Sequence, residues 1–211
     1  MISSPVPIYH ITSIDNLPSI LGSGCLVCPN MHPQDGIAYT SIAHSTIQAV
    51  RTRKRIPCGP GGVLHDYVPF YFAPRSPMLY SLHNNFVEGY SRGQRPIIHL
   101  VSSVEAVQGA SLPYVFSEGQ GIVALTRFFD DPKDLDKIDW GVMPLTMWRD
   151  TIQDGDRKRR RQAEFLVFNT FPWSLVHTIG VVDTVIKRQV DNILEEYAIR
   201  PFVACHPGWY Y

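Results

Sequence analysis

The sequence has few cysteines and no long apolar run. Only four of its 211 residues are cysteine, and no apolar stretch reaches the eighteen residues of a membrane-spanning helix. The first sixteen residues lack the basic start and apolar core of a signal peptide. The chain is long enough to bury one hydrophobic core without disulfides or metal. We therefore expect a cytoplasmic, monomeric protein that does not bind a membrane.

The cysteines and acidic residues give weak support for a metal site. Cys25 and Cys28 have the C-x-x-C spacing and His32 is close enough to be a third ligand, but no second C-x-x-C follows. A structural zinc normally takes four ligands, and the fourth would come from far away. The acidic run 130–139 contains a proline and no recognisable ligand spacing, which disfavours a metal nuclease. We expect no metal.

Charge is balanced overall but unevenly distributed. Residues 51–55 and 157–161 hold nine of the nineteen Lys and Arg residues, and five aspartates lie within residues 130–139. Because each Lys or Arg that meets a phosphate releases a counterion, local basic runs favour nucleic-acid binding even at zero net charge. The alternative is that each run is an ordinary solvated surface.

The spacing of short apolar segments and prolines predicts one α+β domain over residues 1–211. The 17 prolines suit a twisted, mainly antiparallel β core with flanking short helices. Strands are expected at residues 6–12, 68–73, 97–102, 121–128, 164–169 and 177–182, with an edge strand after residue 199. Helices are expected at 17–21, 43–53 and 183–196. Residues 129–162 lack periodicity, and a loop of this length usually has a function.

Three segments carry side chains suited to chemistry. Residues 9–12 (YHIT) lie on the first strand, residues 71–80 are rich in aromatics, and Glu164 begins an apolar strand after five cations. A carboxylate at that position will be partly buried, and Arg160 or Arg161 could hold it ionised. Each segment also has an ordinary interpretation: a core histidine, core aromatics and a structural salt bridge.

Together the three segments resemble the DarT family of DNA ADP-ribosyltransferase toxins, within the ADP-ribosyltransferase superfamily. The resemblance is carried by PIYHITSIDNLPSIL, AVRTRKRIPCGPGGVLHDYVPFYFAPRSPMLY and RQAEFLVF. YFA followed by a later tyrosine also occurs in poly-ADP-ribose polymerases, whereas its combination with YHIT and the Gly-rich loop is more specific. The resemblance implies an ADP-ribosyltransferase-like fold and transfer of ADP-ribose from NAD to a base of single-stranded DNA, with thymine as the expected acceptor. Such an enzyme is a glycosyltransferase, also grouped with the nucleotidyltransferases, and releases nicotinamide.

The resemblance also implies roles at the cofactor. Glu164 matches the catalytic glutamate, which stabilises the positive charge that develops on the ribose as nicotinamide leaves. Arg51 matches an active-site arginine, which neutralises the NAD phosphates or stabilises a base anion, because arginine is a poor general base. Residues 34–55 would fold over NAD. The expected cofactor contacts are His10, Ile11, Thr12, Asn16, Ser19, Arg51, Tyr71 and Phe72.

Residues 114–163 match the segment that recognises the acceptor in this superfamily. A single-stranded target fits, because an unpaired base enters a pocket without extrusion from a duplex. Relatives commonly have histidine where this chain has Gln120, which forms hydrogen bonds but does not titrate, so base choice or sequence preference can differ. The expected DNA contacts are Arg53, Arg55, Arg75, Met78, Tyr80, Arg92, Tyr114, Gln120, Trp148 and Arg160.

Two other functions stay open from the sequence. The first is an RNA-directed NAD-dependent transferase, such as a 2′-phosphotransferase. The second is a non-catalytic module that binds single-stranded nucleic acid with a strong salt dependence and never releases nicotinamide. If the enzyme is a toxin, the resemblance implies a macrodomain antitoxin as a partner that reverses the modification.

Overall fold

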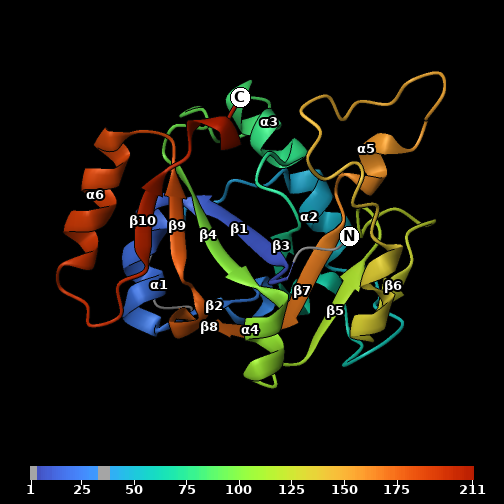
Figure 1. The fold of residues 1–211 in the computed structure, drawn as a ribbon, viewed down its shortest axis with the longest axis horizontal. Helices are drawn as coiled ribbons and strands as arrows, with labels where there is room; N and C mark the ends of the chain where they lie inside the picture. The colour runs from blue at the N-terminus through green and yellow to red at the C-terminus, as the bar shows by residue number, and fades with distance from the viewer. Residues whose placement is uncertain (1–3, 33–38) are drawn as a thin grey trace.

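One large sheet organises the computed structural model, which describes residues 4–32 and 39–211 (Figure 1). Its strand order is β10-β9-β4-β1-β3-β7-β5-β6. The strands are β1 (Pro7–Ser13), β3 (Tyr67–Tyr71), β4 (Ile97–Ser103), β5 (Tyr114–Ser117), β6 (Phe128–Phe129), β7 (Glu164–Phe168), β9 (Thr178–Val181) and β10 (Phe202–Cys205). Among these described strands, only β9 and β10 pair in parallel. Strands β2 (Cys25–Val27) and β8 (Thr170–Pro172) form a separate antiparallel pair.

The central strand β1 pairs very differently with its two neighbours. It pairs with β4 at seven consecutive positions, but with β3 only at Tyr9 and Tyr71. Strand β3 pairs with β7 at five positions, and the last of these pairs joins Tyr71 to Glu164. Because paired residues on neighbouring strands point to the same face, Tyr9, Tyr71 and Glu164 share one face of the sheet.

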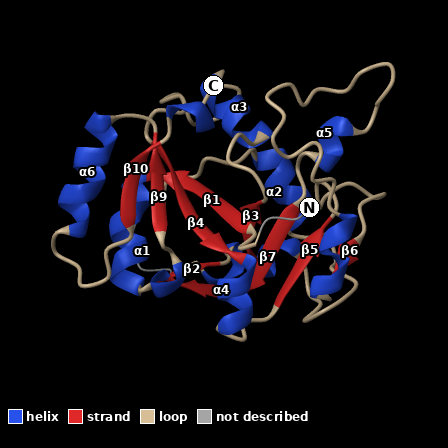
Figure 2. Ribbon diagram, in the orientation of Figure 1, coloured by secondary structure: helices blue, strands red, loops and turns tan. Residues whose placement is uncertain are grey.

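Short helices surround the sheet (Figure 2). They are α1 (Leu17–Ser23), α2 (Ser45–Arg51), α3 (Pro77–His83), α4 (Val104–Gly109), α5 (Arg157–Arg160) and α6 (Thr184–Leu194). Asp183 is the N-cap of helix α6, because its side chain accepts hydrogen bonds from the backbone N–H groups of Val185 and Ile186. The helix buries Ile186, Val190 and Leu194 and lies beside β10 at one end of the molecule (Figure 1).

The strands bury apolar side chains in a main core and two smaller clusters. Fully buried members of the main core include Ile8, Phe70 and Phe165. A second cluster contains Ile11 and Leu79, and packs against the partly buried Met78. The second cluster therefore connects β1 to α3, on the face of the sheet that carries Tyr71.

The predicted α+β class with a mainly antiparallel sheet is confirmed, but the strand predicted at 121–128 is wrong. Residues 121–125 form turns, because backbone hydrogen bonds run from Val123 to Gln120 and from Thr126 to Val123. Strand β5 takes the place beside β7. Helix α3 was missed although Ser76, its N-cap, and Pro77 form a recognisable helix start. No helix in the described ranges is long and apolar enough to cross a membrane.

Candidate active site

Glu164 is the first residue of β7, and both of its carboxylate oxygens are held in place. Arg51 Nη1 donates to Oε2 over 2.8 Å, and the backbone N–H of Gly121 donates to Oε1 over 2.9 Å. The residue is only 4% exposed. A buried carboxylate fixed at two oxygens is a preorganised negative charge, which is the arrangement that stabilises a developing positive charge.

The segment that follows β5 closes against Glu164. The backbone N–H of Glu164 donates to Ser117 Oγ over 3.2 Å, and Ser117 Oγ donates to the carbonyl of Gly119 over 2.7 Å. A Cβ atom added to Gly121 would lie 3.0 Å from Glu164 Oε1 and 3.2 Å from a methyl group of Leu64. Gly121 is therefore suited to this close approach. Sequence reasoning missed it, because residues 121–128 were expected to be a strand.

Arg51, the last residue of α2, is the cation that pairs with Glu164. It is 9% exposed, and its Nη2 is buried without a hydrogen-bond partner within residues 4–32 and 39–211. The sequence suggested Arg160 or Arg161 for this pairing, and the structure corrects that expectation. A guanidinium with one nitrogen on Glu164 and another unused can bind an anion without losing the pair.

Tyr71 lies beside Glu164 across the β3–β7 pair. Its hydroxyl donates to Met78 Sδ over 3.7 Å. Burial raises the pKa of Tyr71, and the negative charge of Glu164 raises it further. Tyr71 therefore stays protonated in the physiological range and keeps its donor, between the carboxylate and the predicted DNA contact Met78.

His10 is held as a neutral imidazole. Its Nδ1 lies 2.8 Å from the carbonyl oxygen of Pro69 on β3, and because a carbonyl only accepts, Nδ1 carries the proton. Burial lowers the pKa of His10 to about 4. Nε2 is then the free acceptor of a neutral ring, which suits a contact with a ribose hydroxyl.

Thr12 and Asn16 connect β1 to the segment expected to cover NAD. Asn16 Nδ2 donates to Thr12 Oγ1 and to the carbonyl of Thr40, both over 3.0 Å, and its Oδ1 accepts from the Thr40 N–H over 2.8 Å. The Tyr39 hydroxyl is 3.3 Å from Thr12 Oγ1. Residues 39–55 of the expected cover are therefore anchored at their start, and residues 34–38 lie outside the described residues.

Two predicted cofactor contacts, Phe72 and Ile11, are packed in the interior, and their contacts with NAD stay predictions. The ring of Phe72 meets Trp140 at 5.4 Å and Phe165 at 6.1 Å between centroids, and only 4% of the residue is exposed. Ile11 is buried in the cluster with Leu79. Strand alternation puts Phe72 on the face opposite Tyr71, in the main core, whereas Ile11 lies on the same face as Tyr9 and Tyr71. Ser19 is half-buried on α1, and its contact with NAD stays a prediction.

The basic run 157–161 is largely neutralised by acidic neighbours. Arg160 binds both Asp139 and Asp154, and Arg159 binds Asp156 over 2.7 Å. These carboxylates lie a few residues before α5 or within the acidic run. The charge of Arg160 holds the 139–156 loop to α5, and its predicted contact with DNA stays a prediction.

The other predicted DNA contacts fall into two groups. Met78 and Tyr80 lie on α3, and Trp148 lies near them, with its ring 5.7 Å from Tyr80. Arg75 stacks over Tyr211 at 4.4 Å. Away from these, the ring of Tyr114 stacks on Phe165, Arg92 pairs with Asp15, and Gln120 donates its backbone N–H to Arg159. The side chains of Arg53 and Arg55 are exposed.

The described residues form no group of three His, Cys, Asp or Glu side chains that could hold a metal ion. His32, the expected third partner of the C-x-x-C pair, instead packs its ring 4.7 Å from that of Tyr39.

Comparison with known proteins connects this geometry to a family. The model of a family described as "ssDNA thymidine ADP-ribosyltransferase, DarT" matches residues 9–211. A DNA ADP-ribosyl transferase of Thermus sp. (strain 2.9) is 45% identical over 209 residues, which are 98% of this chain and 97% of the relative. A fusion of a DNA ADP-ribosyl transferase and a DNA ADP-ribosyl glycohydrolase from Thermosipho africanus is 27% identical over 191 residues, which are 88% of this chain and 46% of the fusion.

Solved structures give the same result. The Thermus sp. 2.9 DarT in complex with ADP-ribosylated ssDNA has a TM-score of 0.93 and 44% identity, and the match covers 99% of this chain and 98% of that one. The same protein in complex with NAD⁺ has a TM-score of 0.88 and 41% identity, with both chains fully covered. Since the family model and the Thermus relative both span nearly the whole chain, the chain belongs to the DarT family of ssDNA thymidine ADP-ribosyltransferases.

Proposed function

We propose that this chain transfers ADP-ribose from NAD⁺ to a thymine base of single-stranded DNA and releases nicotinamide. The observation that carries the proposal is the buried Glu164 carboxylate, held by Arg51 and the Gly121 N–H, in a chain of this family. The predicted enzyme class, NAD-dependent DNA ADP-ribosylation, is confirmed by the family and by relatives solved with NAD⁺ and with ADP-ribosylated ssDNA. Thymine as the acceptor is the finer part of the proposal.

In this reaction the bond between nicotinamide and the ribose breaks first, and nicotinamide leaves with the electron pair. Positive charge develops on the ribose, where the fixed carboxylate of Glu164 stabilises it. The thymine ring nitrogen that carries a hydrogen then forms the new bond to the ribose carbon and gives its proton to water. Both oxygens of Glu164 already accept hydrogen bonds, which suits an electrostatic role for this residue.

Arg51 contributes a second group to the same step. Its Nη1 fixes Glu164, while Nη2 is left without a partner in the described part of the chain. We assign Nη2 to an anionic group of the bound substrates, a phosphate of NAD⁺ or a base that is losing its proton. A guanidinium stays charged throughout, so it stabilises an anion better than it accepts a proton.

The acceptor is tested by mass spectrometry of oligonucleotides incubated with NAD⁺. The set contains single-stranded DNA with one thymine, the same DNA without thymine, the matching RNA and RNA with a 2′-phosphate. A gain of one ADP-ribose on the thymine-containing DNA alone is the expected result. Modification of the phosphorylated RNA alone would favour the 2′-phosphotransferase, and DNA binding without nicotinamide release would favour the non-catalytic module.

We also propose that the enzyme is a toxin that modifies cytoplasmic DNA and is paired with a macrodomain-type glycohydrolase that removes the mark. The Thermosipho fusion protein supports the pairing, because it carries both activities in its name and this chain spans about half of it. The test is co-expression: active enzyme should arrest bacterial growth, and a DNA ADP-ribosyl glycohydrolase should restore it. Growth arrest that Glu164→Gln leaves intact would contradict the proposal.

A further inference from the structure

The turn that carries Gly121 is closed by hydrogen bonds of its own. The backbone N–H of Val123 donates to the Gln120 carbonyl over 3.1 Å, and the N–H of Thr126 donates to the Val123 carbonyl over 3.2 Å. The Thr126 hydroxyl also donates to the Gln120 carbonyl, over 2.8 Å. We call residues 120–126 the glycine turn. Because the turn is closed on itself, whatever holds it in place also fixes where the Gly121 N–H points.

The first basic run, residues 51–55, reaches the glycine turn through Lys54. Lys54 Nζ donates to the Val123 carbonyl over 3.3 Å. The Lys54 carbonyl accepts a hydrogen bond from the N–H of Leu64 over 3.0 Å. The methyl groups of Leu64 would lie 3.2 and 3.3 Å from a Cβ atom added to Gly121. Lys54 is therefore connected to the turn through its side chain and, by way of Leu64, through its backbone.

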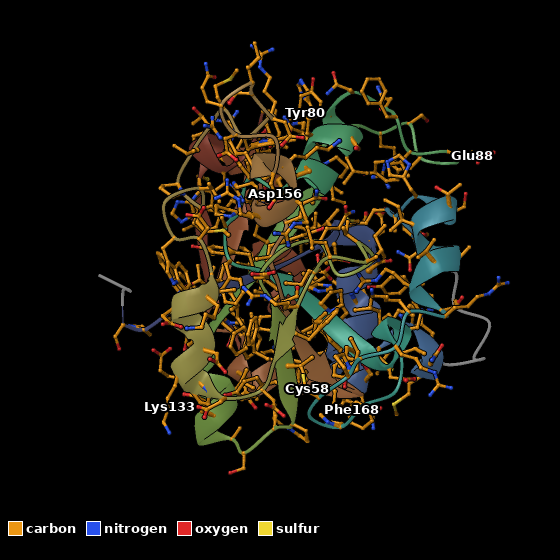
Figure 3. All side chains as sticks on the ribbon, turned by 90° about the vertical axis from the view of Figure 1, so that its right-hand side faces the viewer. Cys58, Tyr80, Glu88, Lys133, Asp156 and Phe168 are labelled. Carbon is orange, nitrogen blue, oxygen red and sulfur yellow. The ribbon has the colours of Figure 1, made fainter. Side chains whose placement is uncertain are left out.

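The second basic run, residues 157–161, reaches the same turn through Arg159. Arg159 Nη1 donates to the Thr126 hydroxyl oxygen over 3.3 Å, and the Arg159 carbonyl accepts from the Gln120 N–H over 3.0 Å. Asp156 accepts hydrogen bonds from Nε and Nη2 of the same guanidinium, both over 2.7 Å. This side of the molecule faces the viewer in Figure 3, where Asp156 is labelled. Arg159 therefore holds the glycine turn with a side chain that is itself held in place.

The two basic runs lie at the same end of β7, next to α2 and within α5 (Figure 1). The Lys54 N–H donates to the Val50 carbonyl over 3.0 Å, so helical spacing continues past the end of α2, and residues three apart share a face. On that face Arg51 binds Glu164 Oε2 directly, and Lys54 binds the turn whose Gly121 N–H binds Oε1. Both oxygens of the carboxylate are therefore fixed from the same helical segment.

We propose that Lys54 and Arg159 are positioning residues for Glu164: they hold the glycine turn so that the Gly121 N–H fixes Oε1. An electrostatic group acts best when it is fixed before the reaction, and a misplacement of about 1 Å costs as much as 10²-fold in rate. Each basic run thus gives one cation to the support of the carboxylate instead of to a DNA phosphate. The inference rests on the proposed function, because it assigns what holds the carboxylate that carries that proposal.

The first test measures transfer and DNA binding on the same variants. Lys54→Met and Arg159→Met remove the cation and keep an unbranched side chain, so single-turnover transfer should fall by about 10- to 10²-fold. The salt slope of binding to a single-stranded oligonucleotide should stay at the wild-type value. Lys187→Met and Arg188→Met, on α6 at the other end of the molecule (Figure 1), are the controls and should change neither quantity. Wild-type transfer, or a slope reduced by about 1 with a matching loss of affinity, would overturn the proposal.

Thr126→Val tests the link to Arg159 without changing a charge. It nearly preserves the shape of a side chain that is 6% exposed, and it removes the hydroxyl that joins Arg159 to the Gln120 carbonyl. Transfer should fall, and Arg159→Met added to Thr126→Val should slow it by less than about twofold more, because the two residues act through one contact. Losses that multiply would overturn the role of Arg159.

The second test asks whether the two cations act through Glu164. In Glu164→Gln the charge to be positioned is removed, so Lys54→Met or Arg159→Met should slow the residual transfer by less than about twofold, since residues that act as a unit are not additive. The Kd for NAD⁺, measured by calorimetry, should stay within about threefold of wild type in every variant. The same fold loss with and without the Glu164 carboxylate, or a rise in this Kd that matches the loss of transfer, would overturn the proposal.

These outcomes are separate from the choice of acceptor. The variants are compared on whichever oligonucleotide the wild type modifies. An acceptor base other than thymine would therefore overturn that part of the proposed function, while the ratios between variants would still support or overturn the positioning roles of Lys54 and Arg159.

Discussion

The charged group around Glu164 and the neutral group around Thr12 satisfy their polar atoms in different ways. Thr12 and Asn16 are buried, and they bond to each other, to Tyr39 and to the backbone of Thr40. Arg51 and Arg161 are also buried, but each has donors with no partner in the described ranges. A satisfied buried network fixes structure, whereas an incompletely satisfied one is common where a ligand completes it. We infer that the neutral group shapes the NAD site and the charged group acts on the reacting atoms.

The largest effect is expected at the carboxylate itself. Glu164→Gln keeps the shape of the side chain but removes the charge, so transfer to DNA should fall by about 10³-fold, near the upper end of what one preorganised electrostatic group supplies. The measurement is single-turnover transfer to a thymine-containing oligonucleotide. Glu105→Gln, on α4, is the control and should retain full transfer. A Glu164→Gln transfer rate within tenfold of wild type would contradict the inference that the charged group acts on the reacting atoms.

A smaller loss is expected for Arg51, because it acts through Glu164 and on an anion. Arg51→Leu should slow transfer by roughly 10²-fold and also lower the free energy of unfolding by about 3–5 kcal/mol, since it leaves a buried carboxylate unpaired. Arg51→Lys should recover stability more than activity, because an ammonium lacks the planar fork of arginine. Chemical denaturation and transfer kinetics measure both. Equal recovery of both properties would assign Arg51 a purely structural role.

A substitution in the neutral group should change stability and the KM for NAD⁺ more than it changes kcat. Asn16→Ala loses three hydrogen bonds and leaves the N–H and carbonyl of Thr40 without this partner, so the free energy of unfolding should fall by about 1–3 kcal/mol. The KM for NAD⁺ should rise while kcat stays within about threefold, because the change affects binding equally before and during reaction. Asn192→Ala, on the exposed face of α6, is the control. A kcat loss as large as that of Glu164→Gln would erase the distinction between the groups.

The neutral histidine predicts a pH dependence of stability. The pKa of His10 is about 4 in the folded chain and about 6.5 when unfolded, so the unfolded state binds the extra proton first. The stability it contributes is complete above pH 6.5 and is lost as pH falls toward 4, by about 1–3 kcal/mol. His10→Gln should flatten this part of the profile, and the exposed His177→Gln should not. Parallel profiles for wild type and His10→Gln would show that the pKa of His10 does not differ between the folded and unfolded states.

The smallest effect is expected in the basic run. Arg160 is already bound to Asp139 and Asp154, so Arg160→Gln should change DNA affinity by less than about twofold and leave the salt dependence of binding unaltered. Arg53→Gln, at an exposed arginine, should lower affinity and reduce the salt slope by about 1 if it meets a phosphate. Binding titrations at several salt concentrations measure both, and a reduced slope for Arg160→Gln would identify Arg160 as a DNA contact.

The sequence predicted the residues whose signals are local. Glu164 stood out because it begins an apolar strand, and the strand alternation that follows it is preserved in β7. Its partner Arg51 lies 113 positions away, and no local pattern reports such a pairing. Gly121 was missed for the same reason, because the need for glycine there depends on how closely the turn approaches Glu164.

Two other errors had signals that were present but not used. Asp154 lies three residues before Arg157, and Asp156 lies three and four residues before Arg159 and Arg160. Opposite charges at this spacing pair on a helix, so the sequence indicated that acidic neighbours neutralise part of the basic run. The aromatic residues of the YFA segment look alike in sequence, yet strand alternation sends Phe72 into the core and Tyr71 toward Glu164. Which face of a strand binds the ligand depends on the sheet as a whole, so a short motif does not indicate that face.

We propose that Glu164 acts on the transition state and not on the binding of NAD⁺. Calorimetry of NAD⁺ binding to Glu164→Gln, alongside its single-turnover transfer to a thymine-containing single strand, separates the two roles. We expect a Kd for NAD⁺ within about threefold of wild type, with transfer reduced by about 10³-fold. A Kd that rises in proportion to the loss of transfer would contradict it, because Glu164 would then be a binding residue alone.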